Sequence, residues 1–156
     1  MYRKLPKAVK QKATWSCWAA GLESWLAAAP FGRKATQQEL IDEYATDSKG
    51  GLDPISAGAT AHRDFQTLAS DFAIKFVVKR GKTLTEDFLD GKLKQGYVLL
   101  IYNLAPNVAH THVVYGIGYP QGNERRVSVM DPSTGGYTNK PIEYYHKRRA
   151  GIVGWP

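Results

Sequence analysis

The chain has 156 residues, of which 43% are hydrophobic and 22% charged, and its formal net charge is +7. This length favours one domain, predicted to span residues 1–156, and the apolar content excludes a disordered or fibrous protein. The positive charge is concentrated at the two ends, and residues 1–12 contain five Lys or Arg and no acid. Residues 1–10 are therefore interpreted as a basic N-terminal arm.

Cysteine content and hydropathy restrict the cellular context. Cys17 is the only cysteine, so an intrachain disulfide is excluded and nothing indicates folding in an oxidising compartment. No apolar run approaches the ~18 residues of a membrane span, and no secretory signal follows the basic N-terminus. We therefore expect a soluble monomer with no membrane partner, whose export, where it occurs, uses another route.

The first half of the chain is predicted to be mostly helical. Apolar residues recur every three or four positions after Ser16, and Pro30 ends this helix. The elements expected next are a helix opened by a capping box at Thr36–Glu39, a loop from Asp47 to about Thr60, a helix over Phe65–Phe72, a strand over Ile74–Lys79 and a helix from Thr85 to Leu93.

The second half has short aliphatic or aromatic runs separated by Gly, Pro and Asn turns, a pattern typical of an antiparallel sheet. Helices first and strands afterwards, without regular alternation, predict an α+β fold. The expected strands cover Tyr97–Tyr102, His112–Gly118, Arg126–Met130 and Ile152–Trp155.

Cys17 lies at the start of the first predicted helix, where unpaired backbone N–H groups and the helix dipole stabilise a thiolate. A lone cysteine is equally well explained as a small buried hydrophobic residue. Position alone therefore leaves a nucleophile and a core residue as equal alternatives.

The residues around Cys17 resemble the nucleophile region of papain-like cysteine proteases. In both, a Gln stands six residues before a Cys-Trp-Ala sequence, here Gln11 before Cys17. The resemblance implies that Cys17 is the nucleophile and Gln11 an oxyanion-hole donor, since a chain entering the helix can lay the Gln amide beside the backbone N–H of Cys17. Losing one such donor typically costs about 100- to 1,000-fold in rate.

A thiolate nucleophile needs a base, and His110 and His112 lie where a strand is predicted to begin. Because side chains alternate along a strand, both histidines would share one face. A metal pair completed by Cys17 or Asp131 is thus an alternative, although no further ligand cluster exists and no cofactor is expected. The remaining histidines have polar neighbours and are expected at the surface: His62 and His146.

The resemblance favours His112 as the base. The run from His112 to Tyr119 fits the family's His-x-Val-x-x-aliphatic-Gly-Tyr strand with His at its head, and His110 does not fit that register. The next strand ends in Asp131-Pro132, which resembles the bacteriocin leader-processing (double-glycine) peptidases and papain-like bacterial effector proteases. The resemblance therefore implies that Asp131 orients His112 in a Cys-His-Asp triad.

These features predict a papain-like α+β fold, with N-terminal helices packed on an antiparallel sheet, and a cysteine endopeptidase that cleaves proteins through an acyl-enzyme. Likeness to leader-processing peptidases implies cleavage after small residues such as Gly-Gly. We further expect a bacterial effector or toxin, delivered by a dedicated secretion system, that acts on proteins in the cytoplasm of a target cell. A cognate inhibitor or immunity protein would be a second partner.

Three other functions stay open. A papain-like peptidoglycan amidase or glutamine deamidase would share the Cys-His pair, although Gln11 favours proteolysis. A basic nucleic-acid or membrane-surface binder is supported only by the charged ends and the aromatic residues, and nucleic acid is not an expected partner. A catalytically inactive papain-like module would not be expected to keep all four active-site residue types.

Overall fold

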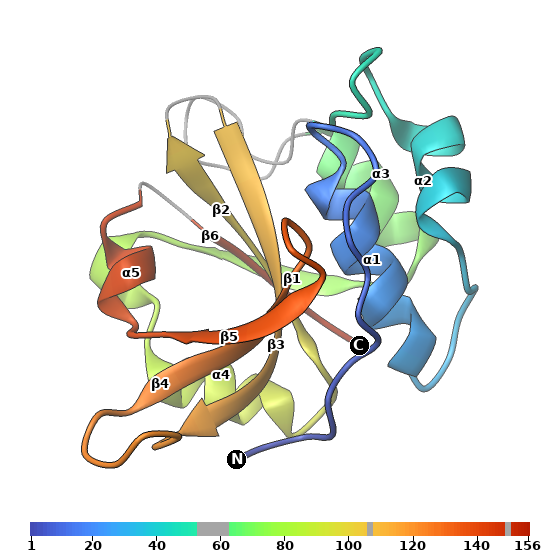
Figure 1. Cartoon of the computed structure of the whole chain (residues 1–156). Helices are drawn as coiled ribbons and strands as arrows, with labels where there is room; N and C mark the ends of the chain where they lie inside the picture. Colours follow the sequence, from blue (N-terminus) through green and yellow to red (C-terminus); the bar gives the residue numbers. More distant parts are fainter. Residues whose placement is uncertain (53–62, 106–107, 149–150) are drawn as a thin grey trace.

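The computed structural model describes residues 1–52, 63–105, 108–148 and 151–156. Within these residues the strands form one antiparallel sheet in the order β1-β6-β2-β3-β4-β5, with helices on both faces (Figure 1). The predicted α+β class is confirmed. The elements are α1 (Cys17–Ala28), α2 (Gln37–Tyr44), α3 (Arg63–Asp71), β1 (Lys75–Lys79), the 3-10 turn η1 (Gly81–Thr83), α4 (Glu86–Leu93), β2 (Val98–Ala105), β3 (Val108–Gly118), β4 (Arg126–Asp131), β5 (Gly136–Lys140), α5 (Glu143–His146) and β6 (Gly151–Trp155).

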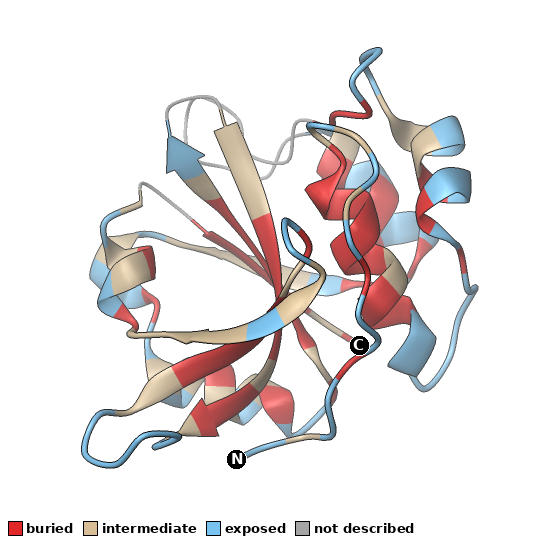
Figure 2. Ribbon diagram, in the orientation of Figure 1, coloured by how far each residue is buried: buried red, intermediate tan, exposed pale blue. Residues whose placement is uncertain are grey.

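The core has two layers, one on each face of the sheet. Leu99 and Ile101 of β2 belong to the cluster formed with α1, α2 and α3. Their neighbours Val98 and Leu100 belong to the cluster formed with α4 and α5. The alternation follows from the period of two along a strand, and burial on both faces makes β2 a continuous apolar run (Figure 2).

The helical predictions are confirmed to within a few residues. The Thr36 hydroxyl accepts from the Glu39 N–H, and the Glu39 carboxylate accepts from the Thr36 N–H, which completes the capping box. Thr85 caps α4 by accepting from the Phe88 N–H. Most of the loop predicted after Asp47 lies outside the described residues, as does His62.

The second half of the chain differs from the prediction in two ways. β3 begins at Val108 and not at His112, because its pairing with β2 continues to Ala105. β5 and α5 were not predicted, since β5 is a polar strand, Gly-Tyr-Thr-Asn-Lys, at the sheet edge and has no apolar alternation. Both differences concern the neighbourhood of the candidate site.

Residues 1–10 lie against the sheet. Tyr2 forms a bridge to Gly116 of β3, and a side-chain carbon at Gly116 would come within 2.1 Å of the Tyr2 ring. The glycine therefore permits this close approach. The next residue of the chain, Gln11, donates its backbone N–H to the Pro132 carbonyl at 2.8 Å, which joins the N-terminal segment to the end of β4.

None of the helices in the described part of the chain is both long and apolar enough to span a bilayer.

Candidate active site

The N-terminus of α1 meets β3 near the start of that strand. The two elements touch closely at Gly21, where an added side-chain carbon would lie 2.6 Å from the Thr111 methyl group. One helical turn earlier, the Cys17 thiol lies 3.7 Å from the carbonyl oxygen of Ala109. A helical turn and a two-residue step along a strand are both about 6 Å long. The crossing therefore brings Cys17 to the level of residues 109 and 110.

Cys17 is 7% exposed and opens α1. The first N–H groups of a helix have no partner within it, so they can stabilise negative charge at this end. Trp18 points into the core, with 3% exposure, and its indole N–H donates to the Gly50 carbonyl at 2.8 Å. Trp18 is therefore a core residue.

The segment before Cys17 is held by two buried polar side chains that the sequence analysis missed. The amide of Gln37, 1% exposed, accepts from the Lys12 N–H at 2.7 Å and donates to the Lys10 carbonyl at 3.0 Å. The Ser16 hydroxyl oxygen lies 3.0 Å from both the Gln37 amide oxygen and the Ala13 carbonyl oxygen, either of which can accept its single proton, and it accepts from the Ala13 N–H at 2.9 Å. These bonds define the path of the chain from Lys10 to Cys17.

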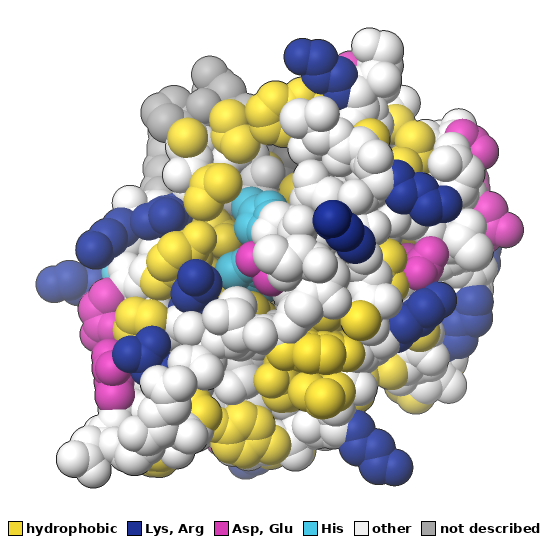
Figure 3. All heavy atoms as spheres, in the orientation of Figure 1, with side chains coloured by type: hydrophobic (Ala, Val, Ile, Leu, Met, Phe, Trp, Pro, Cys, Tyr) yellow, Lys and Arg dark blue, Asp and Glu magenta, His cyan; other side chains and the backbone are white. Residues whose placement is uncertain are grey.

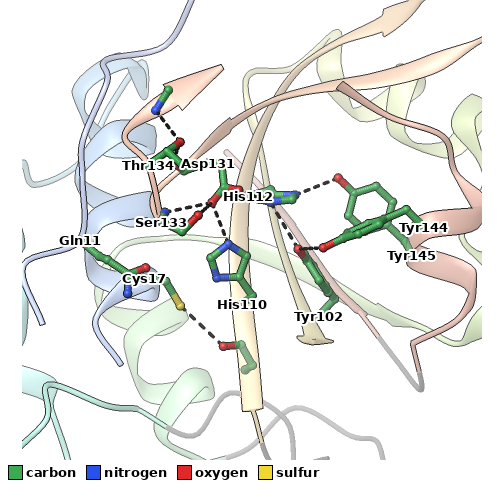
Figure 4. A network of polar contacts seen from close by, with 12 residues as sticks. Gln11, Cys17, Tyr102, His110, His112, Asp131, Ser133, Thr134, Tyr144 and Tyr145 are labelled. Carbon is green, nitrogen blue, oxygen red and sulfur yellow. Dashed lines mark hydrogen bonds and ion pairs between the residues drawn. The ribbon is translucent and has the colours of Figure 1, made fainter. Parts of the chain in front are cut away.

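His110, and not His112, stands between Cys17 and Asp131 (Figure 4). Its Nε2 lies 2.8 Å from Asp131 Oδ1, and the other side of the ring faces Cys17. Burial lowers the pKa of His110, but the hydrogen bond to Asp131, the neighbouring Cys17 thiol and the Asp131 charge outweigh burial and raise it to about 9. The imidazole is therefore positively charged at neutral pH.

Asp131 ends β4, and the turn that follows holds its carboxylate. Oδ1 accepts from the backbone N–H of Ser133 at 2.9 Å and from its hydroxyl at 2.8 Å. Gly135, at φ 70°, lets the chain reverse while its N–H donates to the Asp131 carbonyl. Although burial raises the pKa of Asp131, the hydrogen bonds from His110 and His112 lower it by more, so Asp131 stays ionised.

The structure corrects the predicted place of His112. This residue is the fifth of β3 and not its first, and its side chain is only 1% exposed, against 12% for His110. Its ring hydrogen-bonds to the Tyr145 hydroxyl at 2.9 Å, and its Nε2 lies 3.4 Å from Asp131 Oδ2. His112 therefore lies behind Asp131, about 6.6 Å further along the strand than His110.

A sequence signal for His110 did exist. The family's strand pattern has a Gly six residues after the His, and this spacing fits His110 with Gly116 as well as His112 with Gly118. The Tyr after the Gly favoured His112, but Tyr119 lies beyond the end of β3.

Gln11 lies beside Cys17, as its spacing predicted (Figure 4). Its Nε2 donates to the carbonyls of Ala13 at 3.2 Å and Thr14 at 3.1 Å, and its Oε1 is buried without a hydrogen-bond partner among the described residues. In this state the amide stabilises the loop. A half-turn of the amide group would exchange the positions of Oε1 and Nε2, so that N–H donors would stand where the buried oxygen now lies.

His146 was expected at the surface but is partly buried, and its Nε2 lies 2.6 Å from the Leu84 carbonyl oxygen, away from the site.

The metal alternative has a definite geometric basis. His110, His112 and Asp131 offer ligand atoms that lie within 4.8 Å of one another, and two imidazoles with a carboxylate suit zinc. His110 Nε2 is already hydrogen-bonded to Asp131 Oδ1, which also accepts from Ser133, and both ring nitrogens of His112 have tyrosine hydroxyl partners. A cation would have to replace these bonds, so the arrangement fits a hydrogen-bonded triad better.

The site lies where the helical part of the molecule meets the sheet. On the face seen in Figure 3, histidine atoms reach the surface beside an acidic side chain and apolar atoms. Lys and Arg side chains are spread over this face and do not gather at the site.

The fold is similar to that of a known peptidase. The peptidase domain of Streptococcus mutans ComA, solved in complex with a small-molecule inhibitor, matches 96% of this chain and 99% of its own length, with a TM-score of 0.53 and 16% identity. No protein-family model matches the sequence, and neither does any curated protein. The chain thus has the fold of this peptidase domain, which agrees with the α+β fold that its motifs predicted.

Proposed function

We propose that the chain is a papain-like cysteine peptidase that cleaves protein substrates, with Cys17 as nucleophile and His110 as base. One observation carries this proposal: His110 is hydrogen-bonded through Nε2 to Asp131, and the other side of its ring faces Cys17. This arrangement, at the N-terminus of a helix, is what a thiolate–imidazolium pair requires. The ComA likeness in fold supports the same chemistry.

The expected reaction has two stages. The Cys17 thiolate attacks the scissile carbonyl, and protonated His110 gives its proton to the leaving amine. Water, deprotonated by His110, then hydrolyses the acyl-enzyme. Asp131 accepts from Nε2–H of His110, so the Nδ1 side stays directed at Cys17.

Gln11 and the backbone N–H of Cys17 are the proposed oxyanion donors. In support, the amide of Gln11 lies beside Cys17 in Figure 4, and turning this amide would direct an N–H toward an oxyanion bound there. This turn would break the two hydrogen bonds from Nε2 to the Ala13 and Thr14 carbonyls.

For substrate and setting we propose cleavage after small residues such as Gly-Gly, by a bacterial effector or toxin that acts on cytosolic proteins. The specificity rests on the resemblance to double-glycine leader peptidases, to which the ComA neighbour belongs. A single cysteine and no disulfide suit a reducing compartment. A delivered protease of this kind would have an immunity protein in the producing cell.

The test is N-terminal mapping of a proteome treated with the protein. Because Cys17 is the only cysteine, iodoacetamide modifies this site alone and provides a matched blocked control. We expect new N-termini, preceded mainly by small residues, that appear with the free protein and not with the alkylated one. Identical N-termini in both samples would refute the proposal, and release of peptide from purified sacculi would identify an amidase.

The raised pKa of His110 predicts how activity depends on pH. Because catalysis needs the protonated imidazole and the pKa of His110 is about 9, kcat/KM should fall as pH rises through that value. Asp131→Ala removes a contribution that raises this pKa, so the alkaline limb should move to lower pH. The measurement is kcat/KM against pH on a peptide found by the mapping. A limb that stays in place in Asp131→Ala would contradict the assignment.

A further inference from the structure

Behind Asp131 lies a group of aromatic and polar residues that the proposed reaction does not use. His112 Nδ1 lies 2.9 Å from the Tyr145 hydroxyl, and His112 Nε2 lies 3.3 Å from the Tyr102 hydroxyl. The Tyr102 hydroxyl is also 3.0 Å from that of Tyr144. His112, Tyr102 and Tyr145 are all buried.

The ring of His112 is fixed on several sides. It stacks on Tyr144 with an interplanar angle of 19° and meets Tyr145 edge-on at 88°. Tyr102 also packs against it, with ring centroids 5.2 Å apart. A ring held in this way directs its two nitrogens at fixed partners, Tyr145 on one side and Asp131 with Tyr102 on the other (Figure 4).

The partners determine which nitrogen carries the proton. Burial lowers the pKa of His112 by more than Asp131 raises it, and the charges of His110 and Lys140 lower it further, so the ring is neutral and has one N–H. Nε2 faces the Asp131 carboxylate, where a proton is favourable and a lone pair would be repelled. Nδ1 then accepts from Tyr145, whose pKa is raised by burial, so its hydroxyl keeps its proton.

This tautomer supplies Asp131 with a donor that the turn after β4 does not provide. Oδ1 is held by His110 and Ser133, whereas His112 faces Oδ2. Without the His112 N–H, Oδ2 would lose this neighbour, which helps to keep the carboxylate ionised and oriented.

We propose that His112 is a positioning residue, fixed by Tyr145 as the Nε2–H tautomer, that anchors Oδ2 of Asp131 so that Oδ1 holds His110 toward Cys17. The inference rests on the proposed function, because it concerns the same triad. It gives β3 two histidines with different tasks: His110 reacts, and His112 orients the carboxylate.

The experiment compares His112→Leu with His112→Gln, whose amide N–H can take the place of Nε2–H. His112→Leu should lower kcat by about 10- to 100-fold with little change in KM, as is found for residues that orient metal ligands through hydrogen bonds. It should also shift the alkaline limb of kcat/KM to lower pH, since a less firmly ionised Asp131 raises the pKa of His110 less. His112→Gln should recover much of both effects.

Tyr145→Phe is a second variant, in case His112→Leu does not fold. It removes only the hydroxyl and should lower kcat by about 10-fold, with the same shift of the limb. Tyr44→Phe is the matched control, because its hydroxyl bonds to Asp71 in the α2 and α3 region and its loss should leave kcat unchanged.

The pH dependence of Cys17 alkylation by iodoacetamide separates this inference from the proposed function, because it reports the Cys17–His110 pair without any substrate. If the pH dependence of Cys17 alkylation shifts in His112→Leu and Tyr145→Phe while the wild-type protein cleaves no substrate, the peptidase function is refuted and the positioning role is retained. Unchanged kcat and pH profiles in folded Tyr145→Phe would overturn the inference. A fall in kcat in His112→Gln as large as the fall in His110→Ala would also overturn it.

Discussion

Cys17→Ala is expected to abolish cleavage, lowering turnover by about 10,000-fold or more, because no other group can form the acyl-enzyme. The fold should survive, since Cys17 is a small buried side chain and its thiol makes only a weak hydrogen bond, to the Ala109 carbonyl, among the described residues. The measurement is cleavage of a mapped peptide, with the melting temperature as a check of folding.

Cys17→Ser is the matched control for shape. Its hydroxyl fits the same space but is not ionised by an imidazole, so it should also be almost inactive. A thiol-directed epoxysuccinyl probe should label the wild-type protein and neither variant. Cleavage at a wild-type rate by folded Cys17→Ala would exclude the cysteine mechanism altogether.

His110→Ala is expected to cost about 1,000-fold or more in kcat, because it removes both the proton donor and the cation that stabilises the thiolate. The pH dependence of Cys17 alkylation should then differ from that of the wild type, because the imidazole beside the thiol is gone. The loss should exceed that of His112→Leu, which leaves the Cys17–His110 pair in place. The two variants therefore distinguish the base from the residue behind it.

His146→Gln is the control for removing a histidine. Its ring bonds to Leu84 and has no described contact with the triad, so kcat should stay near the wild-type value. A His110→Ala protein that keeps most of its activity, beside an inactive but folded His112→Leu, would restore His112 as the base and refute the assignment made from the structure.

The early part of the site could be predicted because it depends on local order in the chain. Gln11 stands only six residues before Cys17 in the sequence. The helix that begins at Cys17 follows from the spacing of its apolar residues. The same holds for the capping box at Thr36 and for the Asp131-Pro132 turn, where the residue types themselves determine the backbone. A sequence contains this information directly.

β5, α5 and the buried amide of Gln37 could not be predicted, because each depends on distant partners. β5 is polar and forms only by pairing with β4. Gln37 bonds to backbone groups 25 and 27 residues away. No hydrophobic period marks such residues, and their role is visible only once the chain has folded.

The sequence by itself determined the nucleophile candidate, its Gln partner, the carboxylate at the end of β4 and the α+β class. The proposal of His110 rather than His112 as the base rests on tertiary structure alone. Both histidines lie on one face of β3 and both have a Gly six residues later, so neither side-chain alternation nor spacing separates them. What separates them is where α1 crosses β3: close packing of Gly21 on Thr111 brings Cys17 level with His110, one two-residue step before His112.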